Sequence, residues 1–252
     1  MVPKALAIQT PAQYGAVAPP GNRWPLNAGY EWLVAINKIY PTVQGEGAQA
    51  GTPMTIVRLQ GCPVGCVFCD TPESWKPSQL DPGTAISTAE GNVSIPEGIW
   101  WQTETVAGRV DSLPPRWALI TGGEPTWHYL SYLTSYLHRR KLKTALETAG
   151  VYPITGTWDW ICISPKPAGL LRIKPENLIW ANEIKWLVGR EVDVLALQGF
   201  MRYPPGQLRN DVVVSLQPIS CSAKATDICL EALMQNPEWR LSLQQHKYLG
   251  VA

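Results

Sequence analysis

The residues with the clearest chemical potential are three cysteines on one short segment. Cys62, Cys66 and Cys69 crowd into eight residues, too close together for an ordinary set of disulfides. Thiolates are soft ligands that suit iron-sulfur clusters or zinc. No fourth cysteine or histidine follows nearby, whereas structural zinc sites usually close their tetrahedron with four ligands. The spacing therefore favours a 4Fe-4S cluster with one open iron, with zinc or inert thiols as the alternatives.

A second chemical motif, Thr121 to Pro125, follows the apolar run 118–120 and reads Thr-Gly-Gly-Glu-Pro. Two glycines at the end of a strand let the backbone approach a ligand closely, and Glu124 supplies an acceptor for an ammonium group. Taken alone, the same residues are equally typical of a turn. The motif gains meaning from its position shortly after the cysteine segment.

Three further polar motifs also follow apolar runs that are typical of strands. They are Glu147-Thr148, Ser164 to Lys166, and Gln217-Pro218. The carboxyl ends of parallel strands form the ligand-binding edge of α/β sheets. We therefore expect these motifs, the cysteine segment and Thr121 to Pro125 to form one site.

The elements that position these motifs alternate between short apolar runs and longer helical segments, an order that builds a parallel sheet with crossover helices. Strands are predicted at 32–40, 54–59, 117–121, 143–147, 158–164, 183–188, 212–217 and 240–243. Helices are predicted at 129–140, 191–199 and 223–235. The Pro- and Gly-containing stretch 77–115 surrounds an Ile-Trp-Trp core and is expected to hold one helix within a long connection.

Length and composition favour a single α/β domain. The chain has 252 residues, 45% of them hydrophobic, and we expect an irregular leader at 1–30 followed by one catalytic domain at 31–252. A formal charge of +1 without a basic run argues against nucleic acid as a partner. No apolar run is long enough to span a membrane, so a cytoplasmic protein is expected. Cys162, Cys221 and Cys229 are interpreted as small packed residues without chemistry.

The cysteine segment resembles the signature of the radical S-adenosylmethionine (SAM) superfamily, which has x3 and x2 spacing and an aromatic residue, here Phe68, before the third cysteine. The resemblance implies that the open iron chelates SAM and that an electron from the cluster cleaves it to a 5'-deoxyadenosyl radical. It also implies a partial (β/α) barrel with a mostly parallel sheet. By the same resemblance, SAM contacts Phe68, Asp70, Gly122, Gly123, Glu124, Ser164, Pro165, Lys166, Gln217, Pro218, Ile219 and Ser220.

A narrower resemblance, to the 7-carboxy-7-deazaguanine synthases, covers the chain from about Ile36 to Ala252. It is carried by 40–47, Tyr-Pro-Thr-Val-Gln-Gly-Glu-Gly, by 57–61, Val-Arg-Leu-Gln-Gly, by 69–71, Cys-Asp-Thr, and by the C-terminal segment 239–250. This family resemblance implies a lyase that converts 6-carboxy-5,6,7,8-tetrahydropterin to 7-carboxy-7-deazaguanine by radical ring contraction with loss of ammonia. The product is a precursor in queuosine and other 7-deazapurine biosynthesis.

The family's substrate contacts carry over to Val43, Gln44, Gly45, Glu46, Arg58, Thr121, His246 and Ala252. Gln and carboxylate groups can pair with the donors and acceptors of a pterin edge, and Arg58 can form two parallel hydrogen bonds with the substrate carboxylate. Without the surrounding motif, His246 would be interpreted as a surface or core histidine. The family also uses Mg²⁺, which the resemblance assigns to Thr71, although Asp70-Thr71 is equally compatible with a helix cap.

The sequence departs from the family pattern at the leader, at Glu147-Thr148-Ala149-Gly150, where Asn-Gly commonly follows the threonine, and at Lys38, where an acidic residue is usual. The alternatives are another small radical SAM enzyme, such as a glycyl-radical activase, or a non-catalytic metal-binding module. A glycyl-radical activase has no reason to retain the Gln-Gly-Glu-Gly segment or the His246 segment. The family resemblance further implies a homodimer and a flavodoxin-like or ferredoxin-like electron donor.

Overall fold

The computed structural model describes residues 25–76, 99–166 and 172–250. Within these ranges, nine strands form one open sheet in the order β3-β1-β2-β4-β5-β6-β7-β8-β9. Strand β1 is antiparallel to both of its neighbours, and the pairs from β2 to β9 are parallel. The strands are β1 (Leu33–Val43), β2 (Pro53–Leu59), β3 (Ile99–Gln102), β4 (Trp117–Gly122), β5 (Lys143–Thr148), β6 (Trp160–Ile163), β7 (Glu183–Val188), β8 (Val213–Pro218) and β9 (Arg240–Leu241).

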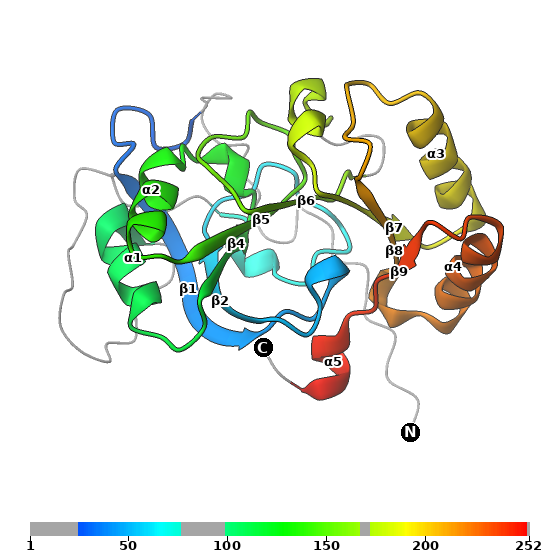
Figure 1. The fold of residues 1–252 in the computed structure, drawn as a ribbon, viewed down its shortest axis with the longest axis horizontal. Coiled ribbons are helices and arrows are strands. Elements are labelled where there is room, and N and C mark those ends of the chain that lie inside the picture. The colour runs from blue at the N-terminus through cyan, green and yellow to red at the C-terminus, as the bar shows by residue number, and fades with distance from the viewer. Residues whose placement is uncertain (1–24, 77–98, 167–171, 251–252) are drawn as a thin grey trace.

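The helices lie mainly on one side of the curved sheet (Figure 1). Helix α2 packs on β5, α3 packs on β7, and α4 packs on β8. The cysteine loop and α5 lie on the other side. The helices are α1 (Thr103–Asp111), α2 (Ser131–Arg139), α3 (Glu191–Arg202), α4 (Ala223–Gln235) and α5 (Gln245–Leu249), with 3-10 turns η2 (Gly47–Gln49), η3 (Pro72–Ser74), η5 (Pro125–Trp127), η6 (Pro175–Trp180) and η7 (Ile219–Cys221).

Alternation along the central strands divides their side chains between two faces. On β4, Ala118 and Ile120 join the large core that also holds Leu133 of α2, whereas Leu119 joins a smaller cluster with Ile56 and Ala145. Since successive side chains of a strand point to opposite faces, residue 121 lies on the same face as Leu119. The same rule brings Arg58, Thr121, Glu147, Lys185 and Gln217 to the inner face, opposite the helix-covered core.

The predicted α/β class with a mostly parallel sheet is confirmed, and the barrel is partial because the sheet does not close. Each predicted strand corresponds to an observed one, and the 223–235 helix has the predicted bounds. The prediction missed β3 and α5, and β1 runs to Val43, three residues beyond its predicted end. The Ile-Trp-Trp segment is an edge strand paired with β1 and leads directly into α1, the helix expected in that region. Residues 77–98 of the stretch lie outside the described ranges.

The described part of the predicted leader, residues 25–30, is attached to the domain. Asn27 is fully buried, and its side-chain amide donates to the carbonyl oxygens of Leu33 (2.7 Å) and Tyr129 (3.2 Å). Its Oδ1 accepts from the Tyr129 amide at 2.8 Å. One polar side chain therefore links the start of β1 to the segment before α2. Among the described residues, no helix has the length and apolar character needed to cross a bilayer.

His128, between η5 and α2, is fully buried beside Trp100, with ring centroids 6.1 Å apart. Among the described residues neither ring nitrogen has a hydrogen-bond partner. Burial lowers the pKa of His128 from 6.5 to about 3. Below about pH 6.5, His128 therefore binds a proton in the unfolded chain but stays neutral in the folded chain. The folded state loses stability as the pH falls through this range.

We expect His128→Phe to remove this loss. Urea unfolding of both proteins at pH 7 and pH 5 measures it, with the wild type losing about 2 kcal/mol more than the variant over that interval. Equal losses in the two proteins would contradict the assignment of His128 as a buried neutral imidazole.

Candidate active site

The inner face opens into a cavity of about 1720 Å³. Twenty-two of the residues predicted from the sequence to bind ligands line it: Val43, Gln44, Gly45, Glu46, Arg58, Cys62, Cys66, Phe68, Cys69, Asp70, Thr71, Thr121, Gly122, Gly123, Glu124, Ser164, Lys166, Gln217, Pro218, Ile219, Ser220 and His246. Pro165 is buried and does not line the cavity, and Ala252 lies outside the described residues. The strand ends thus bring the motifs to one place, as the parallel-sheet interpretation predicts.

The cysteine loop begins at the end of β2, where Gly61 adopts a φ of 103°. The backbone amides of Gly61 and Cys62 donate to the carbonyl oxygens of Ser74 and Trp75 at 2.8 and 2.9 Å. Inside the loop, the Cys69 amide donates to the Cys66 carbonyl oxygen at 3.0 Å. These bonds hold the loop as a closed turn against η3.

All three loop cysteines are free thiols that pack with an apolar cluster of Val64, Ala149 and Val151. Burial, with Glu124 nearby, raises the pKa of Cys62 to about 12, and burial raises that of Cys66 to about 11. Without a bound cation the Cys62 and Cys66 thiols hold their protons at neutral pH. A metal that binds here must displace protons, and soft ligands in an apolar pocket suit an iron-sulfur cluster.

The glycine pair of the second motif packs directly on the cysteine loop. The Gly123 amide donates to the Leu59 carbonyl oxygen at 3.0 Å, and the Glu124 amide donates to that of Gly61 at 2.9 Å. A Cβ on Gly123 would lie 2.1 Å from the Gly61 carbonyl oxygen. Only glycine permits this approach, so the β4 end and the cluster loop form one backbone unit.

The Glu124 carboxylate is almost completely buried and accepts hydrogen bonds from the protein. Its Oε1 accepts from the amide and hydroxyl of Thr126 at 2.9 and 2.7 Å and from the Thr148 hydroxyl. Its Oε2 accepts from the Ala149 amide at 2.9 Å. In this structure the carboxylate therefore links the end of β4 to the end of β5, and the SAM ammonium contact assigned to it stays a prediction.

At the other end of the cavity, the segment after β1 reaches β5 and β7. The side-chain amide of Gln44 donates to Glu147 Oε1 at 2.7 Å. The Lys185 ammonium donates to Glu46 Oε2 at 2.7 Å and to Glu147 Oε2 at 2.9 Å. The Ala48 amide donates to both Glu183 oxygens at 3.0 Å. Because β1 is antiparallel to β2, its last residue, Val43, pairs with Pro53 at the start of β2. This segment therefore begins at the amino ends of the parallel strands, whereas the strand-end motifs lie at their carboxyl ends.

These contacts set the charge of the cavity. Burial alone would raise the pKa of Glu46, but Lys185 and the Gln244 amide lower it to about 2. Burial and the neighbouring Glu46 charge raise the pKa of Glu147, against the effect of Lys185. Burial lowers the pKa of Lys185, but the two carboxylates outweigh this effect and raise it well above its usual value. Lys185 is therefore a permanent ammonium.

The C-terminal segment completes the cavity wall. Gln244 donates to Glu46 Oε1 at 2.9 Å and to Asp70 Oδ2 at 2.8 Å, and Lys247 forms an ion pair with Asp70 at 3.0 Å. A Cβ on Gly45 would lie 2.5 Å from His246 Nδ1, so glycine is required for this approach. The segment thus joins the loop after β1 to the cysteine loop.

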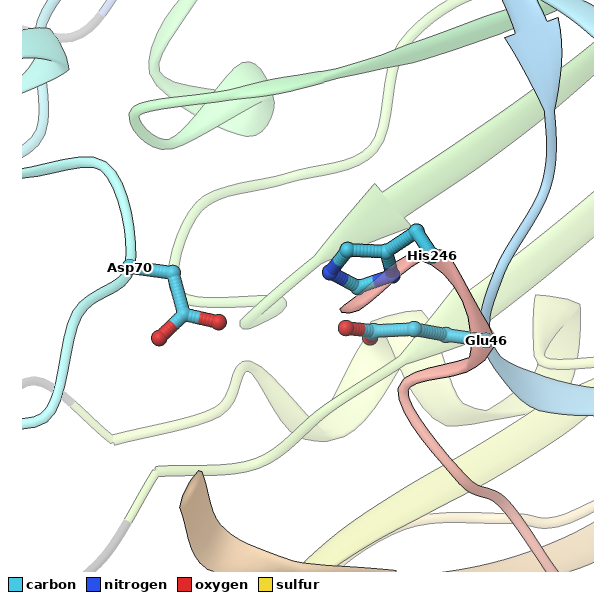
Figure 2. Close-up of side chains that lie close together, drawn as sticks. All are labelled: Glu46, Asp70 and His246. Atoms are coloured by element: carbon cyan, nitrogen blue, oxygen red, sulfur yellow. The ribbon is translucent and has the colours of Figure 1, made fainter. Parts of the chain in front are cut away.

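Glu46, Asp70 and His246 offer ligand atoms that all lie within 4.8 Å of one another. Figure 2 shows Asp70 pointing from the cysteine loop toward Glu46 and His246. Thr71, the predicted magnesium ligand, lies next to Asp70, and its hydroxyl accepts from Arg58 Nη1 at 3.3 Å. Hydroxyl, carboxylate and imidazole groups at one wall could hold a divalent cation.

Lys185 and Gln244 were not among the site residues predicted from the sequence, and Glu147 was expected near the site as a strand-end residue without an assigned role. A signal for Lys185 was present, because a lysine between Ile184 and Trp186 in the predicted strand 183–188 falls on the inner face. Gln244 offered no comparable signal, since its importance depends on contacts with Glu46 and Asp70, which are distant in sequence.

No protein-family model matches the chain. The 7-carboxy-7-deazaguanine synthase of Escherichia coli K12 is 36% identical over 228 residues, covering 86% of this chain and 98% of that protein. The synthase of the same name from Synechocystis is 35% identical over 219 residues, covering 86% and 92%. A crystal structure of QueE from Escherichia coli superposes with a TM-score of 0.72 at 34% identity, covering 85% of this chain and 95% of that one.

Proposed function

The chain belongs to the 7-carboxy-7-deazaguanine synthase family, and we propose that the cavity on its inner face is the active site for that reaction. The protein is a radical SAM lyase that converts 6-carboxy-5,6,7,8-tetrahydropterin to 7-carboxy-7-deazaguanine with loss of ammonia. The observation that carries the placement is that the cysteine loop, the glycine motif and the Gln44 to Glu46 segment line one cavity.

Cys62, Cys66 and Cys69 would hold a 4Fe-4S cluster at one end of this cavity. When bound, the cluster supplies the electron that cleaves SAM and so provides the radical that abstracts hydrogen from the substrate. The polar loop ends nearby would bind SAM. Ser164 and Lys166 already contact one another, with the Lys166 ammonium donating to the Ser164 hydroxyl at 2.9 Å, and Gln217 is held by the Ser242 hydroxyl at 2.9 Å.

The chain itself binds and orients the pterin between the cysteine loop and the β7 wall. Gln44 and Glu46 offer an amide and a carboxylate to the ring edge, and Arg58 offers a guanidinium fork to the substrate carboxylate. Thr121 lies on the inner face, in register with Arg58 on the neighbouring strand. The buried side chains of Leu119 and Val64 exclude water from the same cavity.

We expect Arg58→Gln to raise the KM for the pterin and lower kcat/KM by roughly 10- to 100-fold, because charge-assisted hydrogen bonds contribute about 1.5–3 kcal/mol each. Steady-state kinetics of product formation measure this. The Arg58 guanidinium lies 3.4 Å from the Tyr40 hydroxyl and 3.3 Å from that of Thr71. Tyr40→Phe is the matched control, because it removes one of these neighbours and keeps the guanidinium. An unchanged KM in Arg58→Gln would exclude the carboxylate contact.

The remaining assignments are also proposals. Thr71, together with Asp70, would hold Mg²⁺ beside the substrate carboxylate, since hydroxyl and carboxylate oxygens are ligands that this ion prefers. The cysteine loop reaches the surface at Val67, which is 54% exposed. A flavodoxin-like or ferredoxin-like electron donor would approach the cluster there. A homodimer and a cytoplasmic location are proposed from the family resemblance alone.

The test is anaerobic reconstitution of the cluster, reduction, and addition of SAM, Mg²⁺ and 6-carboxytetrahydropterin, followed by mass spectrometry. Product of the mass of 7-carboxy-7-deazaguanine that disappears when substrate or cluster is omitted supports the proposal. Formation of 5'-deoxyadenosine without the deazaguanine would retain the radical chemistry and overturn the substrate assignment.

A further inference from the structure

Lys185 is a buried cation in the cavity wall. Its side chain is 4% exposed, and its Nζ lies 2.7 Å from Glu46 Oε2 and 2.9 Å from Glu147 Oε2. All three residues line the cavity. An ammonium with such neighbours is fixed in position, because moving it would leave two half-buried carboxylates without a counter-ion.

The carboxylates are also fixed at their other oxygens. Glu46 Oε1 accepts from the Gln244 amide at 2.9 Å, and Glu147 Oε1 accepts from the Gln44 amide at 2.7 Å. Two amides and one ammonium thus hold both carboxylates in place, while each carboxylate oxygen retains a further lone pair. Glu46, Glu147 and Lys185 all line the cavity in which the substrate ring would lie.

We propose that Lys185 is a positioning residue whose ammonium holds the Glu46 and Glu147 carboxylates as paired acceptors for the donor edge of the pterin ring. A 2-amino-4-oxopyrimidine edge presents N–H groups side by side, and ionised carboxylates accept such bonds most strongly. Lys185 remains charged throughout and neither gives nor takes a proton. The inference rests on the proposed function, because it specifies how that substrate is recognised.

The first variant is Lys185→Met, which keeps the length of the side chain and removes its charge. We expect kcat/KM for the pterin to fall at least about 100-fold, mostly through KM, because the carboxylates lose their fixed geometry. Cleavage of SAM in the absence of the pterin should stay within about twofold of the wild-type rate. Lys224→Met is the matched control, since Lys224 is exposed on α4 and does not line the cavity.

The second variant, Lys185→Met with Glu147→Gln, separates positioning from a direct role of the ammonium and guards against misfolding. It removes the ammonium together with one of the two carboxyl groups that the ammonium holds, so the Glu46 carboxylate remains without a second carboxylate beside it. If Lys185 acts through the carboxylates, the double variant should bind the pterin at least about fivefold more tightly than Lys185→Met. A double variant no better than the single one would overturn the proposal, as would a Lys185→Met KM within twofold of the wild type.

Binding is measured separately from turnover by calorimetric titration with oxidised 6-carboxypterin, which has the same ring edge and lacks the C6 hydrogen to be abstracted. Weaker binding to Lys185→Met than to Lys224→Met supports the proposal, and equal binding overturns it. Absence of 7-carboxy-7-deazaguanine in the wild-type assay would instead overturn the proposed function, so the two failures are distinguishable.

Discussion

Cys66→Ala is expected to abolish reductive cleavage of SAM, with a loss of at least about 1000-fold in 5'-deoxyadenosine formation. The physical reason is that the loop offers three thiols, and two cannot hold a cubane that also leaves one iron open. Cys66 is buried among Val64, Ala149 and Val151, where no other side chain of the loop can replace its sulfur. Iron and sulfide analysis after reconstitution, with electron paramagnetic resonance of the reduced protein, measures the loss directly.

Cys229→Ala is the matched control. Cys229 is also a fully buried free thiol, but it packs with Val214 and Leu216 in a core cluster that contains none of the loop cysteines. Removing its sulfur should cost roughly 1 kcal/mol of stability and leave the iron content unchanged. Full SAM cleavage by Cys66→Ala, with normal iron content, would rule out the cluster assignment.

Gly123→Ala is expected to lower SAM cleavage at least about 100-fold and to destabilise the protein by about 3 kcal/mol or more. The new Cβ would lie 2.1 Å from the Gly61 carbonyl oxygen and 2.9 Å from that of Ser74, and both atoms belong to backbone that cannot rotate away. The loop must separate from β4, which breaks the bond from the Glu124 amide to Gly61. Denaturant unfolding without the cluster and 5'-deoxyadenosine assays with it measure the two effects.

Gly199→Ala provides the comparison, because a Cβ at Gly199 meets no atom within 4 Å. The residue lies in α3, where alanine favours the helix by up to about 1 kcal/mol, so the variant should be as stable as the wild type or slightly more so. Near-normal SAM cleavage in Gly123→Ala would show that the glycine pair is an ordinary turn and does not hold the cluster loop.

The central sheet could be predicted from the sequence because the spacing of its apolar residues directly reflects burial. Runs such as 117–121 and 212–217 are short, mainly apolar and end at polar motifs, and each became a parallel strand whose end lines the cavity. Strand β3 could not be predicted in the same way. It lies at the edge of the sheet, and its pairing with β1 depends on a partner more than sixty residues earlier in the chain.

The motif residues show the same difference. Sequence spacing identified Cys62, Cys66 and Cys69, because cluster ligands on one loop must lie close together in the chain. It also identified the glycine motif, but it did not reveal that Gly123 touches the Gly61 backbone or that the Glu124 carboxylate holds Thr148 and Ala149. Those contacts join segments that are distant in sequence, so no local sequence pattern predicts them.

The local chemistry of this protein is encoded in short stretches of sequence: the three thiols, the strand-end polar residues and the alternation that directs them to one face. The charge arrangement of the cavity depends instead on how the chain folds. Glu46 and Lys185 are 139 positions apart, and Gln244 is 198 positions from Glu46. They meet because β1 runs antiparallel to its neighbours and the C-terminal segment returns across the inner face. Electrostatic contacts depend on distance in space, which the fold sets and sequence separation does not reveal.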